Sequence, residues 1–127
     1  MDELAHVVVG QSDGDGGVDA GVLGQGGLDG KGFVGEGDPK KQAETAMENV
    51  HELLADAGAT IQYVCKITTY ITDPSYREGI YSVLAKHFRD VHPVSTGTIV
   101  KGLARPELDF EIDVFAMVPE DKAKGHE

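Results

Sequence analysis

From Asp38 onward the sequence alternates between helical and strand periodicity, and this order constrains the fold more than any other feature. Asp38-Pro39 predicts a helix start, because an Asp side chain caps free backbone N–H groups and proline suits the first helical turn. Gly58 predicts the helix end, since glycine adopts the left-handed conformation there without strain. Between them apolar residues recur with a 3.6-residue period, which indicates an amphipathic helix. They are Ala43, Ala46, Met47, Val50, Leu53, Leu54 and Ala57.

The rest of the chain continues this alternation. Residues 61–71 contain a strand rich in β-branched residues. Asp73-Pro74 repeats the helix-start signal and predicts a second helix over residues 76–88. Two further strands are expected near residues 95–103 and 108–118.

The N-terminal segment has a different composition. Residues 10–37 hold 12 of the 17 glycines, which weakens strand propensity and favours short strands joined by tight turns. The strand candidates are residues 5–9, 18–23 and 33–34. All these elements predict one α+β domain over residues 1–127, with two helices on one face of a mixed sheet of five or six strands. Residues 119–127 are expected to form a frayed tail.

A two-layer domain of this kind leaves one face of its sheet bare. Apolar strand residues such as Val64, Ile99 and Val114 are too numerous for all of them to face two helices. We therefore expect partner subunits to cover the bare face.

Composition limits the classes of partner. The chain carries 22 acidic against 11 basic residues, a net charge of -11, and has no basic cluster. Nucleic acids and anionic membrane surfaces are bound by clustered positive charge, so neither is expected as a partner.

No apolar run approaches the ~20 residues that span a bilayer, and no secretory signal is visible. The single Cys65 fits a reducing compartment, so we expect a cytoplasmic protein. His87 and His92 lack a second ligand pair at suitable spacing, so no metal site is expected.

A set of local motifs lies between residues 24 and 118. They are Gly24-Gln25, Gly37-Asp38, Gln42, Ala57-Gly58-Ala59, Val64-Cys65-Lys66, Tyr70, Thr72-Asp73, Tyr76, His92-Pro93 and Glu111-Ile112. As a set, and in this order of elements, they resemble the reactive-intermediate-deaminase family, also called the Rid or YjgF-type family. The resemblance implies a YjgF-like (chorismate-mutase-like) fold, a homotrimer and small-molecule clefts at the subunit interfaces. Active members hydrolyse enamine or imine intermediates to a 2-keto acid and ammonia, without a metal or a bound cofactor.

Carried over position by position, the resemblance supports binding better than catalysis. Ser95 stands where active members have an arginine, whose planar guanidinium binds the substrate carboxylate in bidentate fashion. Gly97 stands where many members have cysteine. Arg105 lies ten residues beyond Ser95, about 30 Å along an extended strand, so it cannot replace the missing group within one subunit.

Two further positions complete the candidate site. Gly24 matches the glycine of the family's Ser-Gly-Gln turn, with Leu23 in place of the serine. Glu111 matches the strand carboxylate that positions water or shuttles a proton, which makes it the candidate catalytic residue. We expect Glu111 to be partly buried and close to Ser95 or Gly97 on an adjacent antiparallel strand. The plain alternative is an ordinary outward-facing carboxylate.

The pattern is similar to the arginine-lacking Rid subgroups, so three functional hypotheses follow. The first is a protein that binds a small metabolite in intersubunit clefts, with little or no 2-iminobutanoate/2-iminopropanoate deaminase activity. The second is a hydrolase that acts on an uncharged small molecule and uses Glu111 as its acid or base. The third is a chaperone-like or regulatory interaction protein.

Overall fold

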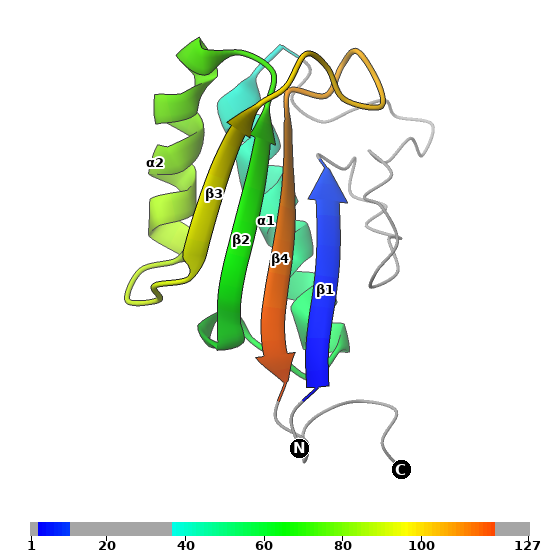
Figure 1. The fold of residues 1–127 in the computed structure, drawn as a ribbon, viewed down its shortest axis with the longest axis vertical. Helices are drawn as coiled ribbons and strands as arrows, with labels where there is room; N and C mark the ends of the chain where they lie inside the picture. The colour runs from blue at the N-terminus through cyan, green and yellow to red at the C-terminus, as the bar shows by residue number, and fades with distance from the viewer. Residues whose placement is uncertain (1–2, 11–36, 119–127) are drawn as a thin grey trace.

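The structure is a computed structural model that describes residues 3–10 and 37–118. This part of the chain contains four strands, two α-helices and two short 3-10 helices. Both α-helices pack against the same face of the sheet, and no helix of the described residues covers the other, bare face (Figure 1). The α+β class with two helices and a mixed sheet, predicted from the sequence, is confirmed.

The sheet has the strand order β1-β4-β2-β3. Along the chain the strands are β1 (Glu3–Gly10), β2 (Val64–Ile71), β3 (Val94–Ile99) and β4 (Phe110–Val118). β4 pairs antiparallel with β1 and β2, while β2 pairs parallel with the edge strand β3. The described residues thus contain four of the five or six expected strands. The candidates at 18–23 and 33–34 lie outside the described residues.

Local capping signals set the bounds of α1 (Pro39–Asp56) as predicted. The Asp38 Oδ1 atom accepts a hydrogen bond of 3.1 Å from the Lys41 backbone N–H. Gly58, just beyond the helix, has a φ of +86°, a conformation that favours glycine. The 3-10 helix η1 (Ile61–Tyr63) then occupies the first positions of the expected strand at 61–71.

The second capping signal acts on a shorter element than predicted. The Asp73 carboxylate accepts a hydrogen bond of 2.8 Å from the Ser75 N–H, which caps the 3-10 helix η2 (Pro74–Tyr76). The helix α2 (Arg77–His87) begins only after this turn. Among the described residues, neither α-helix is long and apolar enough to cross a membrane.

The core lies between the helices and the sheet. Alternate residues of β4 point into it and are at most 1% exposed. They are Phe110, Ile112, Val114, Ala116 and Val118. The expectation that Val64, Ile99 and Val114 cannot all face the two helices is wrong. Val64 and Val114 are both buried on the face that the helices cover. Ile99 shares a face with the buried Ile71, yet stays 49% exposed because β3 is the edge strand.

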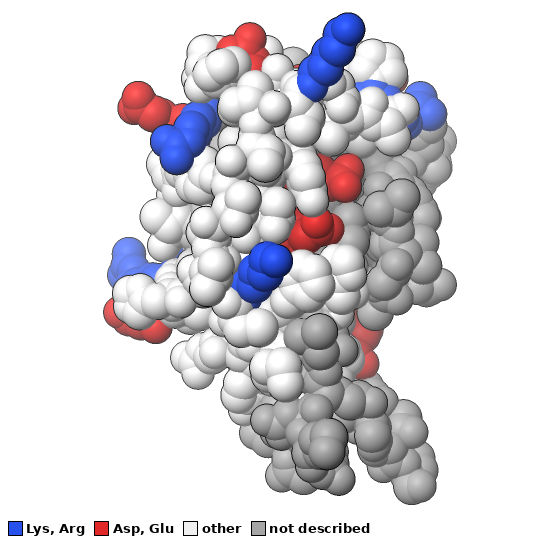
Figure 2. All heavy atoms as spheres, in the orientation of Figure 1, with Lys and Arg blue, Asp and Glu red and all other residues white. Residues whose placement is uncertain are grey.

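The bare face of the sheet is more polar than the sequence suggested. The strand register places a mixed set of residues on it, namely His6, Lys66, Thr68, Tyr70, Val94, Thr96, Thr98, Glu111, Asp113, Phe115 and Met117. Figure 2 shows acidic side chains near the middle of this face with a basic side chain beside them. Val94 and Met117 remain 67% and 40% exposed. Any partner that covers this face must therefore satisfy carboxylates as well as bury apolar surface.

Candidate functional site

Ser95 and Gly97 lie on the face of β3 that the helices cover. The register pairs Ser95 with Ile67 and Gly97 with Thr69, and both partners are buried in the core. Directly paired residues of neighbouring strands point to the same side of a sheet. The structure therefore brings the two predicted substrate-binding residues together, next to α2.

Ser95 lines a pocket between α2 and the edge strand. Its volume of about 430 Å³ lies within the usual range for small-molecule sites. Most of the lining is apolar, and is formed by Ile67, Leu84, Ala85, Phe88, Val91 and Pro93. The remaining lining residues are Ser95, Tyr81 and His92. Such a lining suits a ligand with an apolar body and few polar groups.

Tyr81 connects this pocket to the sheet. Its hydroxyl shares a hydrogen bond of 2.8 Å with the Thr69 Oγ1 atom, beside Gly97. A Cβ atom at position 97 would overlap the Tyr81 hydroxyl, so any larger residue there must displace Tyr81. The Arg77 guanidinium lies over the Tyr81 ring, 4.7 Å from its centroid.

Tyr81 lies within the helix predicted over residues 76–88 but was not among the predicted site residues. A hydroxyl on the apolar side of a helix was the available signal, because such a group needs a partner when it is partly buried.

Glu111 lies on the bare face, away from the pocket. It is half-buried on β4, directly opposite Tyr70 of β2. The expectation that Glu111 is close to Ser95 or Gly97 is wrong, because β2 lies between β3 and β4 and the side chains occupy opposite faces. Burial, together with the neighbouring Asp113 charge, raises the pKa of Glu111.

Asp113 is the centre of a small polar network beside Glu111. The Tyr70 hydroxyl donates a hydrogen bond of 2.6 Å to Asp113 Oδ2, and His6 Nε2 lies 3.4 Å from Oδ1. The hydrogen bond to Asp113 raises the pKa of Tyr70 to about 12. This network holds Asp113 in place and keeps two carboxylates near each other on the bare face.

Two further points concern Gly24 and possible metal ligands. Gly24 lies outside the described residues, so its predicted role stays a prediction. Within residues 3–10 and 37–118 the structure contains no group of three or more potential ligands that could hold a metal ion.

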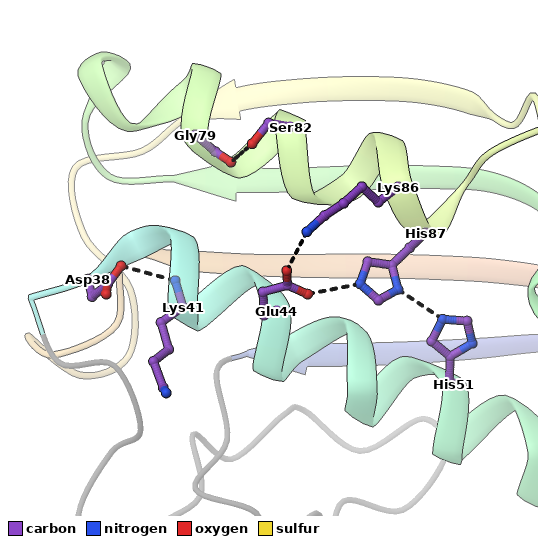
Figure 3. Close-up of polar contacts among 8 residues, drawn as sticks. All are labelled: Asp38, Lys41, Glu44, His51, Gly79, Ser82, Lys86 and His87. Carbon is purple, nitrogen blue, oxygen red and sulfur yellow. Dashed lines mark hydrogen bonds and ion pairs between the residues drawn. The ribbon is translucent and has the colours of Figure 1, made fainter.

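A second polar network joins the two helices on their outer side. Figure 3 shows Glu44 of α1 between Lys86 and His87 of α2, with His51 beyond. The Lys86 Nζ and His87 Nε2 atoms lie 2.8 and 3.1 Å from the two Glu44 carboxylate oxygens. His87 Nδ1 lies 3.1 Å from His51 Nε2. These contacts lower the pKa of Glu44, and burial together with the charge of His87 lowers the pKa of His51.

Comparison with known proteins defines the family. A sequence model of the family described as Endoribonuclease L-PSP matches residues 20–118. The RutC family protein YjgH of Escherichia coli is 35% identical over 86 residues, which are 67% of this chain and 65% of YjgH. This chain therefore belongs to the Endoribonuclease L-PSP family, which includes the YjgF, RutC and Rid proteins.

Solved structures agree with this assignment. The crystal structure of Rv2704 from Mycobacterium tuberculosis, a YjgF-family member, has a TM-score of 0.64 and 32% identity, covering 67% of this chain and 71% of Rv2704. TdcF of Escherichia coli, crystallised with bound serine, has a TM-score of 0.61 and 26% identity, covering 65% of this chain and 66% of TdcF.

Proposed function

We propose that this chain binds a small metabolite in the pocket beside Ser95, that a homotrimer places this pocket at a subunit interface, and that enamine/imine deaminase activity is low. The observation that carries the proposal is the pocket itself, because its volume of about 430 Å³ and its few polar groups suit a small ligand. Its position on the edge strand favours an interface, since an edge strand is open to a neighbour. Serine bound to the related TdcF supports a small-molecule ligand.

Two features argue against efficient imine hydrolysis. Ser95 offers a hydroxyl where a substrate carboxylate needs a charge-assisted contact, which is worth about 1.5–3 kcal/mol, or roughly ten- to a hundredfold in binding. Glu111 faces the opposite side of the sheet from Ser95. Within one subunit, the candidate acid/base and the candidate binding residue therefore cannot act on the same small molecule.

The experiment compares deamination of 2-iminopropanoate, generated in situ, by wild type and by Ser95→Arg. We expect very low wild-type activity and a gain in Ser95→Arg. Ser82→Arg is the control, because it adds the same charge at an exposed position of α2 that does not line the pocket. Wild-type activity equal to that of active relatives would show that deamination does not need an arginine at position 95.

A second candidate function follows from Glu111. A half-buried carboxyl group with a raised pKa holds its proton closer to neutral pH, as a general acid for a neutral substrate requires. We propose to test hydrolysis of small neutral amides and carbamates by wild type, Glu111→Gln and the control Asp113→Asn. Activity that disappears only in Glu111→Gln supports this function. Absence of turnover by wild type contradicts it.

A further inference from the structure

The two histidines that join the outer sides of the helices form a pair that the sequence did not indicate. His51 of α1 and His87 of α2 are 36 residues apart in the chain, yet His51 Nε2 lies only 3.1 Å from His87 Nδ1. The centroids of the two rings are 5.2 Å apart, and the ring planes are inclined by 44°. One ring nitrogen from each helix therefore faces the other (Figure 3).

Glu44 determines which nitrogen of His87 carries the proton. The Glu44 Oε1 atom lies 3.1 Å from His87 Nε2, and Lys86 Nζ donates to the other carboxylate oxygen at 2.8 Å. The hydrogen bond from Lys86, followed by that from His87, lowers the pKa of Glu44, so this carboxylate is ionised at neutral pH and can only accept. His87 therefore donates through Nε2. In the neutral ring Nδ1 then carries the lone pair, which points toward His51.

This arrangement is the one that metal-binding histidines adopt. A histidine that binds a metal through one nitrogen commonly donates its other N–H to a carboxylate, which orients the ring and makes it a stronger ligand. With Zn–N distances of about 2.0–2.1 Å and tetrahedral angles, two imidazole nitrogens on one zinc ion lie roughly 3.3 Å apart. The observed separation of 3.1 Å is close to this value, so a small rotation of either side chain is enough. His51 is exposed and can exchange its proton from Nε2 to Nδ1 through solvent.

We propose that His51 and His87 together bind one Zn²⁺ ion between α1 and α2, with Glu44 as the carboxylate that orients His87. Imidazole nitrogen suits Zn²⁺, whereas Mg²⁺ and Ca²⁺ prefer oxygen ligands. The described residues contain no group of three potential protein ligands, so water completes the tetrahedron. Burial, together with the charge of His87, lowers the pKa of His51, which favours the neutral ring that a metal requires.

Two features limit the affinity of this site. It has two protein ligands, fewer than the four of a closed structural zinc site. The Lys86 ammonium at Glu44 also opposes a second cation. We therefore expect reversible binding. Because the pair lies on the outer side of the helices, the site is independent of the function proposed for the pocket beside Ser95.

The first test titrates Zn²⁺ into the metal-free full chain by calorimetry at pH 7.5, in a buffer that does not bind the metal. We expect one ion per chain in wild type and loss of this binding in His51→Gln and in His87→Gln. Glu44→Gln should weaken binding roughly tenfold, since loss of a carboxylate that orients a metal-binding histidine costs about 10- to 100-fold in affinity. His92→Gln is the matched control, because it removes an exposed histidine outside the pair, and it should bind like wild type.

The second test identifies the ligand atoms from the ¹⁵N chemical shifts of the imidazole rings, which differ between a protonated nitrogen, a free lone pair and a metal-bound nitrogen. Zn²⁺ should shift His51 Nε2 and His87 Nδ1, while Mg²⁺ at the same concentration should shift neither. Absence of Zn²⁺ binding by wild type, or equal binding by wild type and His51→Gln, would overturn the proposal. His51→Gln changes an exposed side chain and leaves the core intact. An unchanged affinity in Glu44→Gln would contradict the orienting role of Glu44.

Discussion

At the scale of single residues, Gly97 is the position where the smallest change should have a clear effect. A Cβ atom there would meet the Tyr81 hydroxyl, so Gly97→Ala must displace Tyr81 or break its hydrogen bond to Thr69. We expect a loss of about 1–3 kcal/mol in the free energy of unfolding, as for other overpacked sites. Chemical denaturation of wild type and Gly97→Ala measures it.

A second substitution separates this clash from other effects of alanine. In a Tyr81→Phe background the hydroxyl is gone, and the Thr69 Oγ1 atom, at 3.4 Å from the position of the added Cβ, is at an ordinary contact distance. Gly97→Ala should then cost much less than in wild type. An unchanged cost would mean that the Tyr81 hydroxyl is not the reason for glycine at this position.

At the scale of elements, the contact between α1 and α2 should weaken in acid. In the folded state the pKa of His51 lies below its ordinary value of about 6.5, which applies in the unfolded state. At a pH between the folded and unfolded pKa values, the folded state therefore binds fewer protons than the unfolded state. The free energy of unfolding should therefore fall as the pH drops below about 6.5. The lowered pKa of Glu44 adds a loss in the same direction, beginning below about 4.5.

The measurement is denaturant unfolding at pH 7.5 and pH 5.5. Because His51 is exposed, we expect its share of the loss to be only a few tenths of a kcal/mol. His51→Gln should reduce the pH dependence by that share, while His92→Gln, outside the network of Figure 3, should retain it. A pH dependence that is the same in His51→Gln and wild type would contradict a role for this contact.

At the scale of the whole molecule, we predict a trimer. The physical reason is the sheet face that none of the described helices covers, which carries the exposed Val94 and Met117 as well as the half-buried Glu111. Gel filtration with light scattering should give about three times the chain mass of 13.5 kDa. The face already carries Asp113, a charge that is paired with His6. Met117→Lys adds a further charge that a covering subunit would have to bury. It should therefore shift the equilibrium toward smaller species more than a substitution on the outer helices, such as Lys41→Glu. A stable monomer at micromolar concentration would contradict the assembly and the interface position of the pocket.

Strand order explains which part of the site the sequence predicted and which part it did not. Ser95 and Gly97 share one short strand with a two-residue spacing, so their common face follows from the alternation of side chains along a strand. Glu111 was expected beside them because β3 and β4 follow each other in the chain, and consecutive strands are often neighbours. The structure inserts β2 between them, and this pairing of distant segments leaves no local signal.

The sequence by itself determined the features that depend on near neighbours. Asp38, Pro39 and Gly58 delimit α1, and the two-residue alternation of β4 selects its buried face, because capping and side-chain periodicity act over a few residues. The tertiary structure alone decided that Arg77 stacks on Tyr81 next to the Ser95 pocket, and that Glu111 faces the other side of the sheet. These relations join α2 to β3 and β4 to β2, and they arise only when packing brings together segments that are far apart in the chain.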